Sequence, residues 1–449
     1  MIVELINTGS ELMLGRVLNT HQQWLCHQLA DLGYVVNRQV AVADSGSDIQ
    51  QAVREALSRA DLIITTGGLG PTSDDLTRDL IAQLLGRKLH ENAEVLAHIR
   101  SFFEIRKRPM PERTSVQALI PAGATVLPNP HGTAPGLAME VRPNPFRPAG
   151  TPSWLIMLPG PPRELRPMFA DTVARLLSQV LPPPGVFVCR TLRTTGIGES
   201  MVQQRIARRL QDAVGAGLDL GYCARPGQVD IRLAALGDGA AKLVSEAETK
   251  VRGLLGPRIY GIEDEELETA IVRLLTARKL TLALAESCTG GNISHRITNV
   301  PGASAVLLAG LVTYSNQAKQ RFLGVQSETL ARHGAVSEPV AREMAEGARR
   351  ETGADYALSV TGIAGPSGGT PDKPVGTVFI GLAGPHGVVV ESNANPYDRE
   401  TFKQVTTQQA LDLLRRTIAT AHGSREPALP PAENSAQPAL KAGDNRTAA

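Results

Sequence analysis

The first 90 residues alternate between short apolar runs and longer stretches in which apolar residues recur with helical spacing. This alternation predicts a parallel α/β sheet, because parallel strands need a crossover connection and a helix usually supplies it. Ser47 and Gln50 have the spacing of a capping box, so the second helix is expected to open at Ser47. The expected order is strand 3–6, helix 18–32, strand 35–42, helix from Ser47, strand 61–66 and helix 75–85.

Proline and composition divide the rest of the chain. Three prolines at 182–184 make a stiff break, and the segment after them holds two strand-like runs among helical stretches, typical of a small α+β unit. The tail from Gly423 has no aromatic or β-branched apolar residue and cannot bury enough surface to fold. The expected domains are 1–178 (α/β), 186–260 (α+β), 262–421 (α/β) and 423–449 (disordered tail). The predicted fold class is therefore α/β, with two three-layer α/β/α domains joined by a small α+β domain.

Composition narrows the classes of partner and compartment. The 449 residues carry 46 Lys and Arg against 44 Asp and Glu, so no global field attracts nucleic acid or an anionic membrane, and nucleic acid is an unlikely partner. Four widely spaced cysteines form no C-x-x-C pair, which argues against a zinc knuckle or a disulfide framework. The first twelve residues lack a basic segment followed by an apolar core, so no leader is expected, and no run approaches the roughly 20 apolar residues of a membrane span. We expect a cytoplasmic protein without a membrane partner.

The loop between the third strand and the third helix has the composition of an anion site. Three glycines, Gly67, Gly68 and Gly70, let backbone N–H groups turn toward a phosphate at the start of the helix. Asp74 and Asp75 close this loop. They are either N-cap residues of the helix or ligands of a divalent cation that also contacts phosphate oxygens.

Carboxylates also follow the first two strands. Asp44 stands at the end of the second strand, and Glu11 follows the first. Because parallel strands end at one edge of a sheet, Asp44 and Asp75 together make a two-carboxylate metal site geometrically possible. Glu11 is a third candidate at the same edge.

In the second α/β domain the run AESCTGG, residues 285–291, follows a strand and precedes a helix. Ser287, Cys288 and Thr289 are thereby expected where backbone amides point outward, which suits an oxyanion or a phosphate. Cys288 is the first candidate nucleophile because sulfur is intrinsically more nucleophilic than oxygen. The alternative for Cys288 is a small buried residue.

Ser287 needs a base, and the histidines near this domain lie in no triad-like context. A lysine kept neutral by desolvation is the other option. The run 312–319 places Tyr314 at a strand end and Lys319 one helical turn later, so both are expected at the same sheet edge. The competing interpretation of Lys319 is a solvated helix lysine.

A G-x-S-x-G match and an arginine at the start of the last helix are two further features of the C-terminal half. Residues 365–369 match G-x-S-x-G, but no helix follows the serine, so the match is accidental. Arg399 opens the last helix and holds either a phosphate or carboxylate, or a surface ion pair. The chain has no Walker A loop, no H-E-x-x-H and no complete G-x-G-x-x-G, which disfavours a P-loop NTPase, a zincin and a standard dinucleotide fold.

With these motifs in view, the chain resembles the CinA family of competence/damage-inducible proteins over residues 1–421. The N-terminal motifs are similar to MogA/MoaB-type molybdopterin-binding domains, and segment 186–260 is similar to the family's KH-like middle domain. The motifs that carry the resemblance are TGGLGPTSDDLT (66–77), GTAPG (132–136), LPGPP (158–162), AESCTGG (285–291), VTYSNQAK (312–319), GAVS (334–337), TGIAGPSGG (361–369) and KPVG (373–376).

The resemblance implies two activities in pyridine nucleotide salvage. The first is a C-terminal nicotinamide mononucleotide (NMN) amidohydrolase that needs no cofactor. The second is an N-terminal ADP-ribose pyrophosphatase that uses a divalent metal (Mg²⁺, Co²⁺ or Mn²⁺). The family also implies a homodimer.

Residue by residue, the resemblance implies a catalytic set of Ser287 as nucleophile, Lys319 as base and Tyr314 in the pocket, in place of Cys288. It implies Asp44 and Asp75 as metal ligands, with an N-terminal site at Glu11, Gly67, Gly68, Gly70 and Asp74. It implies substrate contacts at Glu286, Thr289, Gly290, Gly291, Asn316, Thr361, Gly362 and Arg399.

The chain departs from the family pattern only in its N-terminal half. Ser10 stands where relatives usually carry Asp or Thr, and Thr114 stands where they carry Asn. Two alternatives to catalysis therefore remain: a module that binds a nucleotide or pterin without turnover, and a competence-related scaffold that contacts a recombination protein.

Overall fold

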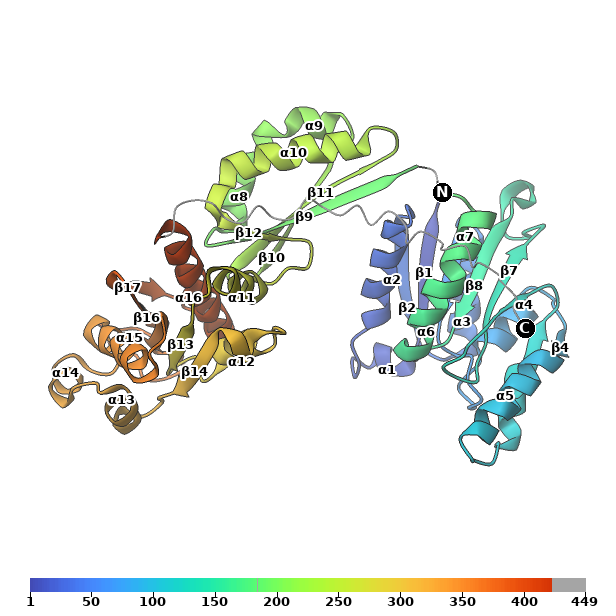
Figure 1. Cartoon of the computed structure of the whole chain (residues 1–449). Coiled ribbons are helices and arrows are strands. Elements are labelled where there is room, and N and C mark those ends of the chain that lie inside the picture. Colours follow the sequence, from blue (N-terminus) through green and yellow to red (C-terminus); the bar gives the residue numbers. More distant parts are fainter. Residues whose placement is uncertain (184, 422–449) are drawn as a thin grey trace, which may run out of the picture. The chain divides into compact units, whose positions relative to one another are not determined.

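The computed structural model describes residues 1–183 and 185–421, which Figure 1 draws in sequence colours. The predicted disordered tail, 423–449, lies outside the described residues. The chain forms two compact units, Met1–Val188 with Ala235–Ala241, and Cys189–Ala234 with the residues from Lys242 onward. Each unit is described by itself.

The first unit is built on a six-stranded sheet with the order β2-β1-β3-β8-β7-β6. β2, β1 and β3 are parallel, which confirms the prediction for the first 90 residues, and β8 joins them in parallel, whereas β7 and β6 run antiparallel. Its strands are β1 (Val3–Thr8), β2 (Val36–Val42), β3 (Leu62–Thr66), β6 (Thr125–Leu127), β7 (Gly136–Val141) and β8 (Ser153–Leu158).

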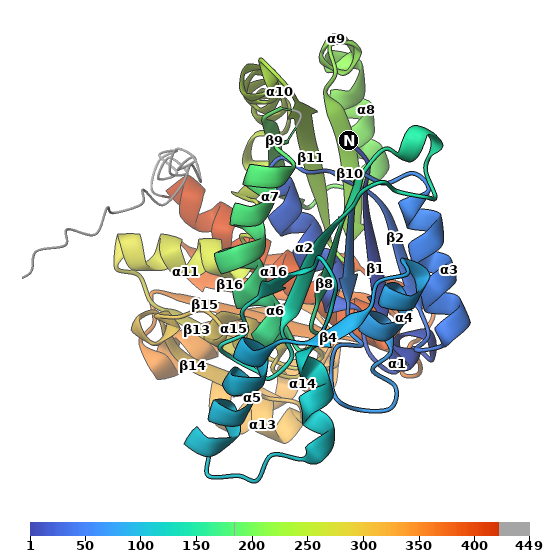
Figure 2. The same cartoon turned by 90° about the vertical axis from the view of Figure 1, so that its right-hand side faces the viewer.

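Two layers of helices cover this sheet, as the two views in Figures 1 and 2 show. α2 (Thr20–Asp31), α6 (Pro162–Met168) and α7 (Ala174–Val180) pack on one face through residues such as Leu25 and Leu165. α3 (Gly46–Leu57) and α4 (Thr77–Leu84) pack on the other through Ile49 and Ile81. The N-cap of α3 is Ser45, which accepts from the Asp48 N–H, so the predicted opening at Ser47 is wrong by two residues.

The remaining elements of this unit lie beside or between the layers. β4 and β5 form a separate two-stranded ladder. The bounds are α1 (Ser10–Met13), β4 (Leu89–Glu91), α5 (Ala93–Ile105) and β5 (Leu119–Pro121).

The middle segment forms a four-stranded sheet with the order β10-β11-β9-β12. Sequence patterning predicted two of these strands. β10 was missed because its residues are half-exposed or exposed without a clear alternation, and β12 was missed because it has only four residues. The elements are β9 (Phe187–Thr195), α8 (Glu199–Ile206), α9 (Gln211–Gly215), β10 (Asp219–Arg225), β11 (Gln228–Leu236), α10 (Ala240–Leu255) and β12 (Ile259–Ile262).

The C-terminal sheet has the order β14-β13-β15-β16-β17, with β14, β13 and β15 parallel and β16 and β17 antiparallel. The hairpin strand β17 was not predicted. The strands are β13 (Leu282–Glu286), β14 (Leu307–Val312), β15 (Tyr356–Gly362), β16 (Thr377–Gly384) and β17 (Gly387–Ala394). The helices are α11 (Leu267–Arg278), α12 (Asn292–Thr298), α13 (Asn316–Leu323), α14 (Ser327–His333), α15 (Glu338–Thr352) and α16 (Arg399–Ala421).

Side-chain alternation in β13 explains the two helical layers of this domain. Leu282 and Leu284 face the core shared with α11, α12 and α16. Ala283 and Ala285 face α15, where small side chains let the helix pack close to the sheet. The α/β fold class is thus confirmed. Within the described part of the chain, no helix is long and apolar enough to span a membrane.

Candidate active sites

Ser287 and Lys319 meet at the carboxyl edge of the C-terminal sheet. Ser287 directly follows β13, and Lys319 lies in the second turn of α13, which follows β14. Because β13 and β14 are parallel neighbours, their ends lie side by side. The Lys319 Nζ lies 2.9 Å from the Ser287 Oγ, and the two residues are 1% and 8% exposed. The interpretation of Lys319 as a solvated helix lysine is therefore wrong.

The surroundings of Lys319 favour a neutral amine. Burial lowers its pKa from 10.5 to about 8. Its Nζ also contacts the carbonyl oxygens of Thr313 at 2.8 Å and Tyr314 at 3.3 Å, and no carboxylate pairs with it among the described residues. Two carbonyls accept the two protons of a neutral amine, which leaves the nitrogen lone pair for the Ser287 hydroxyl proton. The geometry is that of a general base next to a nucleophile.

Cys288 has the opposite environment for a nucleophile. It is 6% exposed, and burial raises the pKa of its thiol to about 12, although nearby N–H groups and Lys319 act in the other direction. The thiolate is the reactive form of cysteine, so Cys288 is inert at neutral pH. Its side chain belongs to the core beneath the loop. This is the small buried residue that the sequence left open as an alternative.

Glu286 anchors the loop from below. It is fully buried, and its carboxylate accepts hydrogen bonds from the N–H groups of Gly291, Ile293 and Ser294 and from the Ser294 hydroxyl. The carboxylate thus satisfies the first N–H groups of α12. A fully hydrogen-bonded buried group is unsuited to the substrate contact expected for it, and Glu286 instead positions the loop that carries Ser287.

The amide groups of this loop are not equally free. The Gly290 N–H donates to the Ser287 carbonyl and the Gly291 N–H to Glu286. Within the described residues, the N–H groups of Cys288 and Thr289 donate to no oxygen acceptor. Thr289 is fully buried, so the Cys288 N–H, next to the nucleophile, is the better placed of the two for an oxyanion.

Two residues expected to contact substrate take structural positions. The Thr361 hydroxyl is buried and donates to the Ala335 carbonyl at 2.7 Å, which ties the end of β15 to the GAVS segment. Lys373 donates to the His333 and Val336 carbonyls of the same connection, both at 2.7 Å. Gly362 is the last residue of β15. These contacts join three of the sequence motifs into one loop assembly.

The remaining predicted residues lie at the rim. Tyr314 and Asn316 are exposed at the start of α13. Arg399 donates to the Tyr314 hydroxyl at 3.0 Å and to the Gly365 carbonyl at 2.9 Å, so it clamps the glycine-rich loop to the tyrosine, and no surface ion pair of Arg399 is present in the described part of the chain. The Asp398 carboxylate caps α16 by accepting the N–H groups of Glu400 and Thr401.

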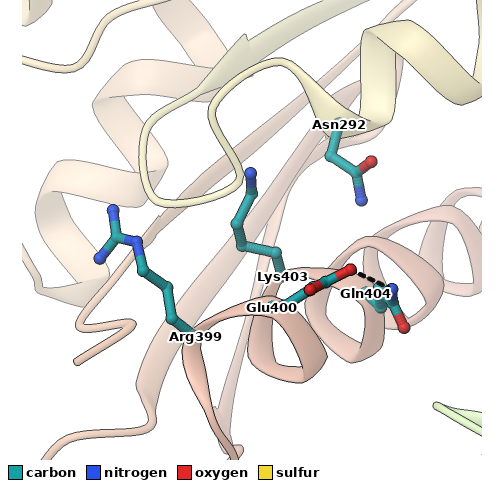
Figure 3. A pocket seen from close by; sticks show the side chains of 5 residues that line it. All are labelled: Asn292, Arg399, Glu400, Lys403 and Gln404. Carbon is teal, nitrogen blue, oxygen red and sulfur yellow. Dashed lines mark hydrogen bonds between the residues drawn. The ribbon is translucent and has the colours of Figure 1, made fainter. Parts of the chain in front are cut away.

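A cavity of about 450 Å³ opens beside this rim, lined by Asn292, Arg399, Glu400, Lys403 and Gln404 (Figure 3). Only Arg399 among these residues was predicted. The available signal was the spacing of Arg399 and Lys403, since residues four apart share one face of a helix.

The N-terminal sheet edge gathers the predicted carboxylates on separate loops. Asp44 and Ser10 form a reciprocal pair of hydrogen bonds. The Ser10 N–H donates to the Asp44 Oδ2 at 2.8 Å, and the Asp44 N–H donates to the Ser10 Oγ at 3.2 Å. Ser10, a departure from the family pattern, thus supports Asp44 directly. Glu11 lies in α1 and is exposed.

Asp75 is held within the glycine-rich loop. Its Oδ2 accepts from the Thr72 N–H and hydroxyl, and a Cβ at Gly70 would lie 2.3 Å from that oxygen. Leu76 occupies the N-cap position of α4 without a side-chain bond, so the N-cap interpretation of Asp74 and Asp75 is wrong. Asp74 is exposed, and its hydrogen bond with Thr72 lowers its pKa.

The carboxylates of Asp44 and Asp75 supply only part of the ligand set that a metal ion needs. Among the described residues, no three His, Cys, Asp or Glu side chains gather closely enough to enclose an ion. The Oδ1 atoms of Asp44 and Asp75 have no hydrogen-bond donor within the described residues. Each of the two carboxylates therefore keeps one oxygen without a donor in the described part of the chain.

Two motifs without an assigned role reach the same edge. A Cβ at Gly132 would lie 2.0 Å from the Glu164 Oε2, and Asn129 donates to that buried carboxylate at 2.8 Å. The Gly67 N–H donates to the Leu158 carbonyl at 3.0 Å. LPGPP is therefore a structural neighbour of the glycine-rich loop, and GTAPG packs against the start of α6, which follows LPGPP.

Comparison with known proteins places these sites in a family. The model described as CinA C-terminal domain matches residues 264–418, "Probable molybdopterin binding domain" matches 4–179, and "Damage-inducible protein CinA KH domain" matches 189–261. A CinA-like protein of Akkermansia muciniphila is 44% identical over 410 residues, which cover 91% of this chain and 95% of that protein. The chain belongs to the CinA family. The resemblance found in its motifs is confirmed.

Other CinA relatives agree. A protein of Symbiobacterium thermophilum, named as competence-damage inducible, is 44% identical over 434 residues, covering 93% of this chain and 99% of that protein. Among solved structures, the competence/damage inducible protein CihA from Agrobacterium tumefaciens has 41% identity and a TM-score of 0.33, covering 33% of this chain and 92% of that one. These names identify the family and specify no reaction.

Proposed function

We propose that the C-terminal domain is an amidohydrolase that converts NMN and water to nicotinic acid mononucleotide and ammonia. The observation that carries this proposal is the buried Ser287–Lys319 pair, with 2.9 Å between Oγ and Nζ and a lysine pKa lowered to about 8. A carboxamide is the chemical group on which such a pair acts, and family resemblance supplies the mononucleotide. We further propose that the protein works as a cytoplasmic homodimer.

The proposed reaction proceeds in two steps. Lys319 takes the Ser287 proton as Oγ attacks the carboxamide carbon, and the Cys288 N–H stabilises the oxyanion. Collapse of the tetrahedral adduct breaks the C–N bond, and Lys319 passes its proton to the departing ammonia. Water then attacks the acyl-serine, giving up a proton to Lys319. Breaking the ester bond returns the proton from Lys319 to Ser287 and releases the carboxylic acid, which loses its own proton to solvent.

The test is ammonia release from NMN by the full chain and by Ser287→Ala, Lys319→Met and Cys288→Ala, each with and without chelator. We expect loss of turnover by about 10³-fold or more in the first two variants and nearly unchanged turnover in the third. Turnover that survives Ser287→Ala within a few-fold contradicts the proposal. So does a wild-type chain that releases no ammonia.

A second proposed activity, metal-dependent ADP-ribose pyrophosphatase, concerns the N-terminal edge. It is supported by the two carboxylates of Asp44 and Asp75, each with one oxygen free of donors in the described chain. A bound divalent ion would neutralise pyrophosphate charge and activate water. Gly67, Gly68 and Gly70 would let the backbone of this loop approach the phosphates closely because they have no side chain, and Leu69 is buried in the core. AMP formation from ADP-ribose that persists in excess chelator contradicts this proposal.

The alternatives to turnover have separate signatures. A binding module for a nucleotide or pterin would bind ADP-ribose tightly and form no AMP in any divalent metal. A competence scaffold would require a recombination protein as partner. Arg205, Arg208 and Arg209 form an exposed basic cluster in the middle segment, and this cluster by itself does not lead us to propose nucleic acid as a partner.

A further inference from the structure

The 450 Å³ cavity beside the catalytic loop has a distinctive charge distribution (Figure 3). Arg399 and Lys403 extend from the first two turns of α16, and Asn292 reaches in from the start of α12. Glu400 is the only carboxylate in the lining, and it accepts from Gln404 at 3.5 Å along the helix. Two cations against one carboxylate give the cavity a net positive charge.

Lys403 differs from Arg399, the other cation of this cavity, in its hydrogen bonding. Within residues 1–183 and 185–421 its ammonium makes no hydrogen bond or ion pair, although the side chain is half-buried. Arg399, in contrast, already donates to the Tyr314 hydroxyl and the Gly365 carbonyl. An ammonium that lines a cavity and has no acceptor among the described residues favours an anionic ligand.

The position of Lys403 connects the cavity to the nucleophile. A Cβ at Gly290 would lie 3.9 Å from the Lys403 Nζ, and Figure 3 shows this ammonium pointing toward the loop before α12. Gly290 is three residues after Ser287, and its N–H donates to the Ser287 carbonyl. One molecule can therefore present an amide to Ser287 and an anion to Lys403.

We infer that this cavity is a phosphate-monoester subsite in which Lys403 is the principal contact of the dianion, while Arg399 mainly positions Tyr314 and the glycine-rich loop. The inference rests on the proposed amidohydrolase and names the part of the substrate that the enzyme recognises. The cavity admits a pentose phosphate rather than a bare phosphate, because it is several times larger than one phosphate group. Lys403 thereby makes the enzyme select mononucleotides over their nucleosides.

The kinetic test compares two amide substrates that differ only in the phosphate, NMN and nicotinamide riboside. The measured quantity is the ratio of their kcat/KM values in the full chain. We expect Lys403→Met to lower this ratio about 10- to 100-fold, and Lys403→Arg to restore most of it, because a charged hydrogen bond to phosphate is lost and regained. Lys250→Met, which removes an exposed charge from α10, is the matched control and should leave the ratio unchanged. An unchanged ratio in Lys403→Met overturns the inference.

A binding test keeps the inference separate from the proposed activity. Titration of the wild-type chain with ribose 5-phosphate, followed by calorimetry, should show binding that Lys403→Met weakens about 10- to 100-fold and Lys250→Met does not. Binding of this kind, in a chain that hydrolyses no amide, would refute the amidohydrolase and retain the phosphate subsite. Equal affinity in wild type and Lys403→Met would refute the subsite even if the amide is hydrolysed.

Discussion

The two sheet edges differ in how complete their chemistry is. At the C-terminal edge, nucleophile and base are in contact and buried, and a lowered lysine pKa follows from that burial. At the N-terminal edge, Asp44 and Asp75 lie on loops where each is held through one oxygen, and the other oxygen faces no donor in the described chain. In the activities proposed above, the first edge acts with protein groups alone, whereas the second acts with a bound divalent ion. Burial sets the strength of a base, and exposure leaves carboxylates available as ligands.

The largest expected effect separates the two edges completely. Ser287→Ala and Lys319→Met should each lower amide hydrolysis by about 10³-fold or more, because nucleophile and base act as a unit. ADP-ribose cleavage in the same preparations should change less than two-fold. Parallel assays of ammonia and AMP make the measurement. If both activities fall together, the two edges are not independent.

The reverse experiment acts on the N-terminal edge. Asp75→Asn should lower ADP-ribose cleavage about 100-fold and weaken the activating effect of Mg²⁺, because it removes a charged ligand. Asp74→Asn is the matched control, since Asp74 is the exposed neighbour in the same loop. Measuring AMP formation against Mg²⁺ concentration checks both variants. Equal losses in the two variants would contradict a specific ligand role for Asp75.

The lysine at the C-terminal edge should impose a pH dependence that the other edge lacks. Because the pKa of Lys319 is lowered to about 8, it is protonated below that pH, and kcat/KM for the amide should fall about tenfold per pH unit below 8 and level off above it. A midpoint near the ordinary value of 10.5 in the pH–rate profile would rule out a desolvated base.

The same shift affects stability. The folded pKa of Lys319 lies below its unfolded value of 10.5, so this group binds more protons in the unfolded chain between pH 8 and 10.5, and its contribution to the free energy of unfolding should rise with pH across that window. This contribution is about 3 kcal/mol. Because the raised pKa of Cys288 acts in the opposite direction above pH 9, the quantity to measure is the difference in the free energy of unfolding between the wild-type chain and Lys319→Met, which chemical denaturation at pH 8 and 10 should show to rise with pH.

The smallest expected effect on activity is that of Cys288→Ala, which tests the contrast between Cys288 and its neighbour Ser287. Cys288→Ala should change amide hydrolysis less than about threefold, because the buried thiol stays protonated. It should lower the free energy of unfolding by about 1–2 kcal/mol through lost packing. Ammonia assays and denaturant titrations measure the two quantities. A large loss of activity at unchanged stability would give Cys288 a direct role in the reaction.

Local patterns predicted much of the fold. The alternation in the first 90 residues and the glycine-rich turns after strands placed β1, β2, β3 and β13 within a few residues of their observed bounds. The antiparallel additions at the sheet edges were missed, among them β6, β7 and β17. β6 has only three residues, and the apolar residues of β7 and β17 stand next to one another without alternating with polar ones. The cap of α3 was placed at Ser47 instead of Ser45, since several serines and an aspartate compete there.

The sequence predicted which loops form the candidate site, but it did not predict which side chains of these loops contact one another. The sequence singled out Ser287, Lys319 and Cys288 but left the choice of nucleophile to family resemblance. It put Arg399 at the start of the last helix and missed Lys403, although both lie on one face of α16. Arg399 and Tyr314 are 85 positions apart in the sequence, so local sequence patterns predict neither their hydrogen bond nor the cavity beside it.

The sequence by itself determined the family, the α/β class and the loops where chemistry occurs, because strand periodicity, glycine turns and motifs are local properties of the chain. The tertiary structure decided which side chains are buried, which contact each other and which charges are left without a partner. Lys319 becomes a base and Cys288 an inert thiol only because distant strands and helices remove both from water. Desolvation depends on everything packed around a group, and no short stretch of sequence encodes it.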